Sequence, residues 1–264
     1  MNHLHRELAP ISDAAWARID SEAREALHEF LAGRRLVDFD GPHGWEHAAV
    51  PTGAVEPIED GRGETVLLRS VLRLVEVRVP FSVARETLRQ IDRGAPAVDL
   101  TPVIDAARDA AAIEDGAVFD GMEAAGIAGC AGGSDHEPVA FGSITGLADA
   151  VAEATAVLQD AGVDGPYGLA LGSDLWHDVV STIEGGYPLV NHLRLIADGQ
   201  VVRARTVDGA VLLSLRGGDF QLVVGGDFAV GYEASDTEEV RLYITETFTF
   251  RNLEPAAAVA LRPS

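Results

Sequence analysis

The 264-residue sequence is poor in several residue types, and each shortage excludes a class of protein. Its single cysteine, Cys130, excludes an intrachain disulfide framework and a multi-cysteine metal site, and it fits a reduced, cytoplasmic setting. No run of about 18 apolar residues is present that would cross a membrane. Residues 1–11 lack the apolar core of a signal peptide, so we expect any export to occur without that tag.

Basic residues are also scarce. The 20 Lys and Arg residues face 42 Asp and Glu residues, which gives a formal net charge of −22. No basic stripe is present that could displace the counterions of a nucleic acid, so nucleic acid is disfavoured as a direct partner. The negative charge serves solubility or attracts cations to an enclosed acidic surface. Hydrophobic residues make up 47% of the chain, which is ordinary for a globular protein.

One stretch dominates the pattern. From Val55 the chain reads as two strand-like runs joined by Asp60-Gly61, a strong β-hairpin signal. The second run, residues 64–79, would span roughly 50 Å if extended, and Ser70 is the expected bend. A compact chain of this length is only about 47 Å across. We therefore expect an arm that leaves the body and is buried against another copy of the chain.

Capping residues and apolar spacing predict the helices of the first half. Ser12 suits an N-cap, and spacings of three and four predict a helix over residues 13–32. A short helix is expected at 83–90. Thr101 and Pro102 have the residue types of an N-cap and a first helical position, and they predict a long Ala-rich helix to about Ala125.

The Gly-rich residues 126–142 mark a change of composition and an expected domain boundary. Beyond it the pattern alternates between helix and strand. Thr145 and Ser173 are expected N-caps. Residues 240–252 alternate regularly and predict a long strand that returns to the first domain. The predicted segments are helices to 161, 183 and 197, and strands at 36–39, 168–171, 201–204, 210–216 and 220–224, with a turn at Gly217-Gly218.

Two fragments resemble catalytic motifs, but each lacks a position or spacing that the motif requires. Ser134-Asp135-His136 contains the residue types of a catalytic triad, but neighbours in sequence cannot form a relay. His28-Glu29 begins a zinc-protease pattern, yet Ala32 stands at the second ligand position. No dinucleotide or Walker A motif is present. We predict no catalytic residue, no metal site and no cofactor.

End to end, the chain resembles the encapsulins, bacterial and archaeal nanocompartment shell proteins earlier described as linocin-type bacteriocins. The segment from Ile244 to Phe250 is the most specific part of the match. The other matching residues are Leu4, Arg6, Ala9-Pro10, Trp16, Gly33-Arg34, Val37-Asp38, Gly44-Trp45-Glu46, Val98-Asp99-Leu100, Gly165-Pro166-Tyr167, Gly186-Tyr187-Pro188-Leu189, Arg216-Gly217-Gly218-Asp219-Phe220 and Gly231-Tyr232-Glu233.

The resemblance implies an α+β fold like that of the HK97 phage major capsid protein. Such a fold has a peripheral domain with a spine helix, an extended β-hairpin arm and an α/β axial domain. It also implies a T=1 icosahedral shell of about 60 copies. The expected parts are the N-terminal arm and helix (1–49), the extended loop (50–80), the spine-helix part (81–129), the axial domain (130–225) and a C-terminal strand returning to the peripheral domain (226–264).

In this family, cargo proteins carry a C-terminal peptide that docks inside the shell. Leu27, Leu31 and Arg34 would share one helical face and form an apolar groove with a charged rim. The plainer alternative is that Leu27 and Leu31 are core residues. The positions that match the dock are Leu27, Leu31, Arg34, Asp38, Val230, Tyr232 and Ile244.

The loop Glu184-Gly185-Gly186-Tyr187 matches the five-fold pore of the family, or else is an ordinary interhelix loop. Gly-Gly there would make a mobile, wide constriction. Some members stack a flavin on a tryptophan, but Arg85-Glu86-Thr87 stand at the matching place, so no flavin is expected. The resemblance implies that the cargo, a dye-decolorising peroxidase or a ferritin-like protein, holds any haem or iron. A prophage capsid protein and a hydrolase are the alternatives.

Overall fold

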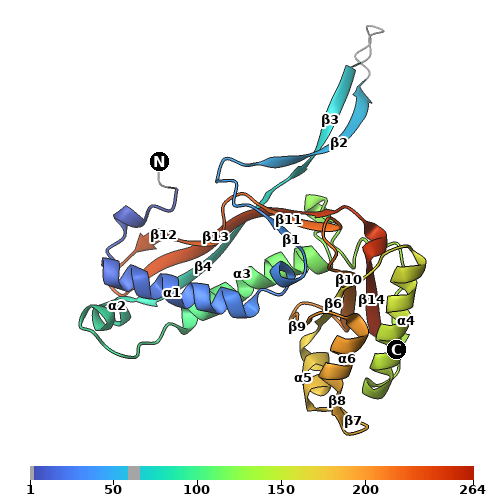
Figure 1. Ribbon diagram of the computed structural model, residues 1–264. Helices are drawn as coiled ribbons and strands as arrows, with labels where there is room; N and C mark the ends of the chain where they lie inside the picture. The colour runs from blue at the N-terminus through green and yellow to red at the C-terminus, as the bar shows by residue number, and fades with distance from the viewer. Residues whose placement is uncertain (1–2, 59–65) are drawn as a thin grey trace.

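The computed structural model describes residues 3–58 and 66–264. Figure 1 shows two lobes and a projecting arm. One lobe carries α1, α3 and a twisted sheet, the other holds a second sheet with α4, α5 and α6, and a two-stranded arm rises away from both. The hairpin turn expected at Asp60-Gly61 lies outside the described residues.

The N-terminal helix is shorter than its sequence pattern predicts. α1 (Asp13–Phe30) begins at the expected N-cap Ser12, whose side chain accepts an amide hydrogen of the first turn. It ends at Phe30 rather than at residue 32. The carboxylate of Asp115 accepts hydrogen bonds from the Ala32 and Gly33 amides at 2.8–3.2 Å. Asp115, more than 80 residues away in sequence, therefore binds the two backbone amides that follow the end of α1.

The spine helix α3 (Thr101–Phe119) is confirmed, with corrected ends. Its N-cap is Leu100, one residue before the predicted Thr101. It stops at Phe119 instead of near 125, and the chain then passes through Gly121 at φ +95°, a backbone conformation that favours glycine. The short α2 (Arg85–Asp92) begins two residues later than predicted.

The first sheet is built around the longest strand, β13 (Glu239–Asn252), as the alternation at 240–252 predicts. β13 pairs antiparallel with β4 through residues 239–248, with β12 through 240–245 and with β11 through 248–252. β1 adds to β11 in parallel. The other strands are β1 (Asp38–Asp40), β4 (Val75–Ala84), β11 (Phe220–Val224) and β12 (Ala229–Ser235).

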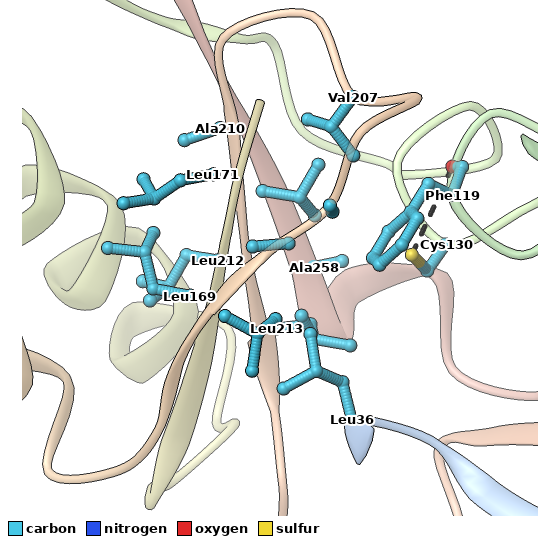
Figure 2. Packing of buried hydrophobic residues seen from close by; sticks show 14 of the residues in the cluster. Leu36, Phe119, Cys130, Leu169, Leu171, Val207, Ala210, Leu212, Leu213 and Ala258 are labelled. Atoms are coloured by element: carbon cyan, nitrogen blue, oxygen red, sulfur yellow. Dashed lines mark hydrogen bonds between the residues drawn. The ribbon is translucent and has the colours of Figure 1, made fainter. Parts of the chain in front are cut away.

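The second sheet has the order β5-β14-β10-β6-β9. Its strands are β5 (Val139–Phe141), β6 (Tyr167–Leu171), β9 (Val201–Arg203), β10 (Ala210–Ser214) and β14 (Ala258–Pro263), and its helices are α4 (Leu147–Asp160), α5 (Ser173–Ser181) and α6 (Leu189–Ala197). Figure 2 shows Leu169 and Leu212 in its core, and on the other side of the view Cys130 beside Phe119, with its thiol 4.0 Å from the Phe119 carbonyl oxygen. Burial raises the pKa of Cys130 to about 12, which leaves an unreactive thiol.

Two predicted helix caps shift by a residue or more. A 3-10 turn (Ile144–Gly146), capped by the Ser143 hydroxyl, precedes α4, so Thr145 lies inside that turn. The N-cap of α5 is Gly172, and Ser173 is its first residue. The remaining 3-10 turns are Arg6–Leu8, Gly33–Arg35, Glu123–Ala125 and Pro255–Ala257.

Strand pairing corrects two expected boundaries. Residues up to 225 were expected in the second domain, but β11 pairs with β13 in the first sheet. The expected turn at Gly217-Gly218 is therefore not a hairpin between paired strands but a crossover from one sheet to the other. The C-terminal segment also divides, because β13 joins the first sheet and β14 pairs with β10 and β5 in the second.

The arm consists of β2 (Ala49–Ile58) and β3 (Val66–Arg73) paired antiparallel. Ser70, the expected bend, lies inside β3 opposite the register shift between Pro51 and Val55 of β2, and the strand itself is interrupted at Leu74. The reason is a change of partner, since β3 pairs with β2 and the next strand, β4, pairs with β13. Figure 1 shows this ribbon projecting from the body, as the length of the run predicts.

Candidate functional site

A groove with a volume of about 680 Å³ lies between α1 and the β12 edge of the first sheet. One wall comes from α1 and the 3-10 turn that follows it, and the other comes from β12 and the loop that leads into it. Its lining residues are Arg6, Asp20, Ala23, Arg24, Leu27, His28, Leu31, Arg34, Arg35, Asp227, Phe228, Ala229, Val230 and Ile244.

The apolar floor of the groove is also part of the protein core. Leu27 and Leu31 are 9% and 8% exposed, and Val230 and Ile244 are buried in the same hydrophobic cluster. The two interpretations of Leu27 and Leu31, core or groove, are therefore compatible. Each side chain stabilises the fold on one side and lines the groove on the other.

Arg34 forms the charged end of the groove. Its guanidinium donates to both carboxylate oxygens of Glu114 at 2.7–3.0 Å and to Glu246 at 2.5 Å, and it pairs with Asp227 at 2.9 Å. The rings of Phe39 and Phe228 lie 5.0 and 4.9 Å from it. Burial by itself would lower the pKa of Arg34, but Glu114 and the other two carboxylates raise it. The guanidinium is fixed in place and permanently charged.

Two fully buried carboxyl groups share this one cation. Glu114 and Glu246 are each 0% exposed, and the Oε2 atom of Glu246 has no hydrogen-bond partner among the described residues. Burial, with the neighbouring Glu114, raises the pKa of Glu246 well above its usual value. Two like charges beside one guanidinium repel each other, which acts on the pKa of Glu246 in the same direction as burial.

The N-terminal segment lies against β12 and β13, and it lines the groove through Arg6. The amide of Tyr232 on β12 donates to the Leu4 carbonyl at 2.8 Å, and the Tyr243 hydroxyl donates to the carbonyl of His3 at 3.2 Å. The imidazole of His3 stacks on Trp45 with ring centroids 4.0 Å apart. These contacts hold the turn at residues 3–4 against the outer edge of the first sheet.

The fold brings five of the seven predicted groove residues together: Leu27, Leu31, Arg34, Val230 and Ile244. Leu27, Leu31 and Arg34 do not share one helical face as predicted, because α1 ends at Phe30 and Arg34 lies on the 3-10 turn Gly33–Arg35. The turn nevertheless directs Arg34 to the same side.

Asp38 and Tyr232 do not line this groove. The Asp38 carboxylate accepts a hydrogen bond from the Gly218 amide at 2.6 Å, in a smaller cavity of about 190 Å³ between the sheets. The hydroxyl of Tyr232 lies 3.1 Å from that of Ser235.

Sequence reasoning missed the polar rim, which includes Arg6, Asp20, Arg24 and Asp227. Arg6 donates to both carboxylate oxygens of Asp20 at 2.7 and 3.1 Å, and its guanidinium lies 3.9 Å from the Trp16 ring. Asp20 and Arg24 lie four residues apart on α1, so they share one face of the helix, and this spacing is visible in the sequence. Nothing local in the sequence joins them to residue 227.

The predicted pore loop is a small hairpin at the far tip of the second lobe (Figure 1). β7 (Ile183–Glu184) pairs with β8 (Tyr187–Pro188), and Gly185 and Gly186 form the two-residue turn with φ of +56° and +85°. Two positive φ values are the pattern of a type I′ turn, which glycine adopts without strain. An added Cβ at either glycine would meet no atom within 4 Å.

The serine and histidine side chains of the triad-like segment 134–136 each bind a backbone carbonyl. The Ser134 hydroxyl donates to the carbonyl of Ala258 at 2.6 Å, and an imidazole nitrogen of His136 lies 2.9 Å from the Ala256 carbonyl, so neither faces the other as nucleophile and base. Among residues 3–58 and 66–264, no three His, Cys, Asp or Glu side chains are placed to hold a metal ion. No helix within the same ranges is both long and apolar enough to cross a bilayer.

The long spine helix, the projecting ribbon and the second α/β lobe together define the HK97-like capsid fold. Solved structures share this arrangement. The virus-like particle from Pyrococcus furiosus covers 94% of this chain and 99% of its own, with a TM-score of 0.67 and 17% identity. The Gordonia phage Cozz structure covers 89% and 87%, with a TM-score of 0.55 and 13% identity.

Sequence comparisons give the family. A family model described as "Encapsulating protein for peroxidase" matches residues 1–249. Type 1 encapsulin shell proteins of Rhodospirillum rubrum and Brevibacterium linens are 46% and 43% identical, covering 99% of this chain and 97% and 99% of their own. That of Mycobacterium tuberculosis is 40% identical, with 99% of both chains covered. The chain belongs to the type 1 encapsulin shell proteins, which are structural subunits rather than enzymes.

Proposed function

We propose that this chain builds a closed T=1 icosahedral shell of about 60 copies that encloses a cargo protein. The observation that supports it is the groove between α1 and β12, which combines a buried apolar floor with a fixed guanidinium at one end. Such a groove suits an extended peptide with alternating apolar anchors. In this proposal the cargo's C-terminal segment lies over Leu27, Leu31, Val230 and Ile244, beside Arg34.

The rim of the groove favours a chain end that carries a carboxylate. Arg6 is paired with Asp20, and Arg34 with its three carboxylates. Arg24 and Arg35 have no ion-pair partner within the described residues, so the rim keeps positive charge in a chain of net charge −22. Asp38 and Tyr232, whose side chains lie outside the groove, would contribute only through neighbouring residues.

The arm supports assembly. Leu67, Leu68 and Val71 on β3 and Val55 on β2 are 49–55% exposed, and side chains on both faces of the ribbon are uncovered in the single chain. An exposed apolar ribbon of this kind is normally buried by a partner. In the proposed shell, a neighbouring copy covers it.

The hairpin tip Glu184–Tyr187 is proposed as the lining of a five-fold pore that admits small molecules to the cargo. Two glycines without side chains keep that tip narrow in cross-section, so a ring of tips leaves an opening between them. The description of the matching family supports a peroxidase as the cargo, with a ferritin-like protein as the other candidate. We place the compartment in the cytoplasm, which fractionation of the source cells would test.

The groove is tested by substitutions that separate folding from cargo capture. Leu31→Asp should leave assembled shells that lack cargo. Because Leu31 is buried and this variant can fail to fold, Phe228→Ala provides a second test, with Phe39→Ala as its matched control. Both rings stack on Arg34, but only Phe228 lines the groove.

Electron microscopy and mass spectrometry of the purified particles measure assembly and contents. The proposal predicts full cargo with Phe39→Ala and reduced cargo with Phe228→Ala. Normal cargo yield in well-assembled Leu31→Asp and Phe228→Ala particles would reject the groove. Particles filled with DNA instead of protein would indicate a prophage capsid.

A further inference from the structure

The strand that forms one wall of the groove has an unused backbone edge. Within residues 3–58 and 66–264, β12 pairs with β13 and with no second strand. In an antiparallel pair, the backbone groups of alternate residues point away from the partner strand. The amide of Tyr232 does so, because it donates to Leu4, which lies outside the sheet. The alternation therefore assigns Phe228 and Val230 to the same outward-pointing set.

The three outward amides differ in what they bind. The first, Phe228, donates to the neighbouring Asp227 carboxylate at 2.8 Å. The last, Tyr232, donates to the carbonyl of Leu4 at 2.8 Å. The middle one, Val230, has no hydrogen-bond acceptor among the described residues. Val230 is 3% exposed, and an unpaired amide at a buried position costs free energy that a partner would recover.

The residue with the unpaired amide also lines the groove. Val230 lines it together with Leu27 on α1 and Leu31, the residue that follows α1. The Leu4 carbonyl accepts the neighbouring outward amide, that of Tyr232, so this edge of β12 already binds backbone from outside the sheet. Residues of the same outward set are two positions apart, or about 7 Å along a strand. A peptide strand in the groove would therefore meet the Val230 amide one such step away from the Tyr232 amide that Leu4 occupies.

We propose that the cargo segment binds by strand addition, with its main chain hydrogen-bonded to Val230 on β12 and alternate apolar side chains directed onto Leu27 and Leu31. This inference rests on the proposed function of the groove and adds the mode of recognition. Main-chain bonds supply affinity in such complexes, and pockets for alternate side chains supply specificity. The partner is therefore an extended C-terminal segment with small or polar residues between its apolar anchors, and without proline at the paired position.

Val230→Pro isolates the main-chain bond. Proline removes the N–H, and it is tolerated on an edge strand where that N–H is not part of the ladder. Val230→Ala is the matched control, because it shortens the side chain and keeps the N–H. The probe is a fluorescent protein carrying a C-terminal tail of six Ser-Leu repeats, co-expressed with the full chain and measured as fluorescence per assembled particle.

Loss of one hydrogen bond should reduce capture of the tail by Val230→Pro about tenfold beyond the loss in Val230→Ala. Equal capture by the two variants, with capture abolished in Leu31→Asp, would overturn strand addition and leave the groove intact. Capture unaffected by Leu31→Asp and Phe228→Ala would instead overturn the groove itself, and failure of the chain to capture the tail at all would count against both.

Hydrogen exchange provides a measurement that needs no variant and covers the case in which Val230→Pro fails to fold. The Val230 amide should exchange rapidly in empty shells and slowly in shells that hold the tailed probe. Slow exchange in empty shells would show that a segment of a neighbouring copy already occupies the edge, and unchanged exchange on loading would show that the tail binds elsewhere. Either result would overturn the proposal.

Discussion

The guanidinium of Arg34 lies 2.5 Å from the Oε1 atom of Glu246, although 212 residues separate the two in sequence. The same guanidinium binds Glu114 on the spine helix. One side chain therefore joins the turn after α1, the helix α3 and the central strand β13. This junction lies at one end of the groove, so the geometry of the groove depends on it.

Replacing Arg34 by methionine should strongly destabilise the subunit. The substitution leaves two buried carboxyl groups without their cation, and breaking a buried pair in this way costs about 3–5 kcal/mol. Arg35→Met is the control, since Arg35 is exposed and makes one side-chain bond to a backbone carbonyl; its cost should be below about 0.5 kcal/mol. Urea midpoints at one fixed protein concentration compare the two, and equal midpoints would contradict the account.

The titration of Asp115 should make the free energy of unfolding depend on pH. Burial raises the pKa of this carboxyl group from 3.8 to about 7. Between those values the folded chain holds a proton that the unfolded chain has released. The free energy of unfolding therefore falls as the pH rises from about 4 to 7, by up to about 1.4 kcal/mol per pH unit. The 20 basic side chains are all arginines and stay charged throughout this range.

Asp115→Asn should make the free energy of unfolding less dependent on pH between about 4 and 7. The asparagine oxygen can still accept a hydrogen bond from the Gly33 amide. The relevant quantity is the difference between wild-type and variant unfolding free energies, measured at several pH values. The difference should decrease with pH. Glu246→Gln should change the profile in the same direction, because the pKa of Glu246 is also raised. A difference that rises with pH would show that Asp115 is ionised in the folded chain.

Two glycines should respond in opposite directions to alanine. Gly116 lies within α3, where an added Cβ meets no atom within 4 Å, so Gly116→Ala should stabilise the chain by up to about 1 kcal/mol. At Gly132 a Cβ would lie on the backbone oxygen of Asp120, so Gly132→Ala should destabilise by about 3 kcal/mol or more. Thermal unfolding of both variants measures the two signs.

The arm should be required for assembly and dispensable for folding of the lobes. Leu67→Lys combined with Leu68→Lys places a charge on each face of the ribbon, where both side chains are more than half exposed in the single chain. Burial of these charges by a neighbour would be costly. Sedimentation should show small species with the circular dichroism of the wild type. Normal particles from this variant would exclude a buried arm.

Local features were predictable from sequence where the information is local. The N-cap at Ser12, the strand Phe220–Val224 and the alternation over β13 agree with the structure to within a residue. The capped helix starts at 101 and 173 were also found within one residue. Caps and period-two patterns depend on neighbours in the chain, so their errors are small.

Strand partners were not predictable in the same way. Gly217-Gly218 has the sequence of a hairpin turn, yet it joins two sheets, because β11 finds its partners at residues 38–40 and 248–252. The break at Leu74 has the same origin, a change of partner rather than a local bend. The groove is a third case. Five of its residues came from the family resemblance, whereas its rim joins residues 6 and 20 to residue 227 through tertiary packing alone.

The mass of the purified chain in solution tests the central claim most directly. Mass photometry at nanomolar to micromolar concentration should find closed particles of about 1.7 MDa, which corresponds to about 60 copies of the 27.8 kDa subunit. Electron micrographs of the same sample should show hollow spheres. A well-folded species that remains near 27.8 kDa at every concentration would contradict the account, because its arm would then be stable without a neighbouring copy.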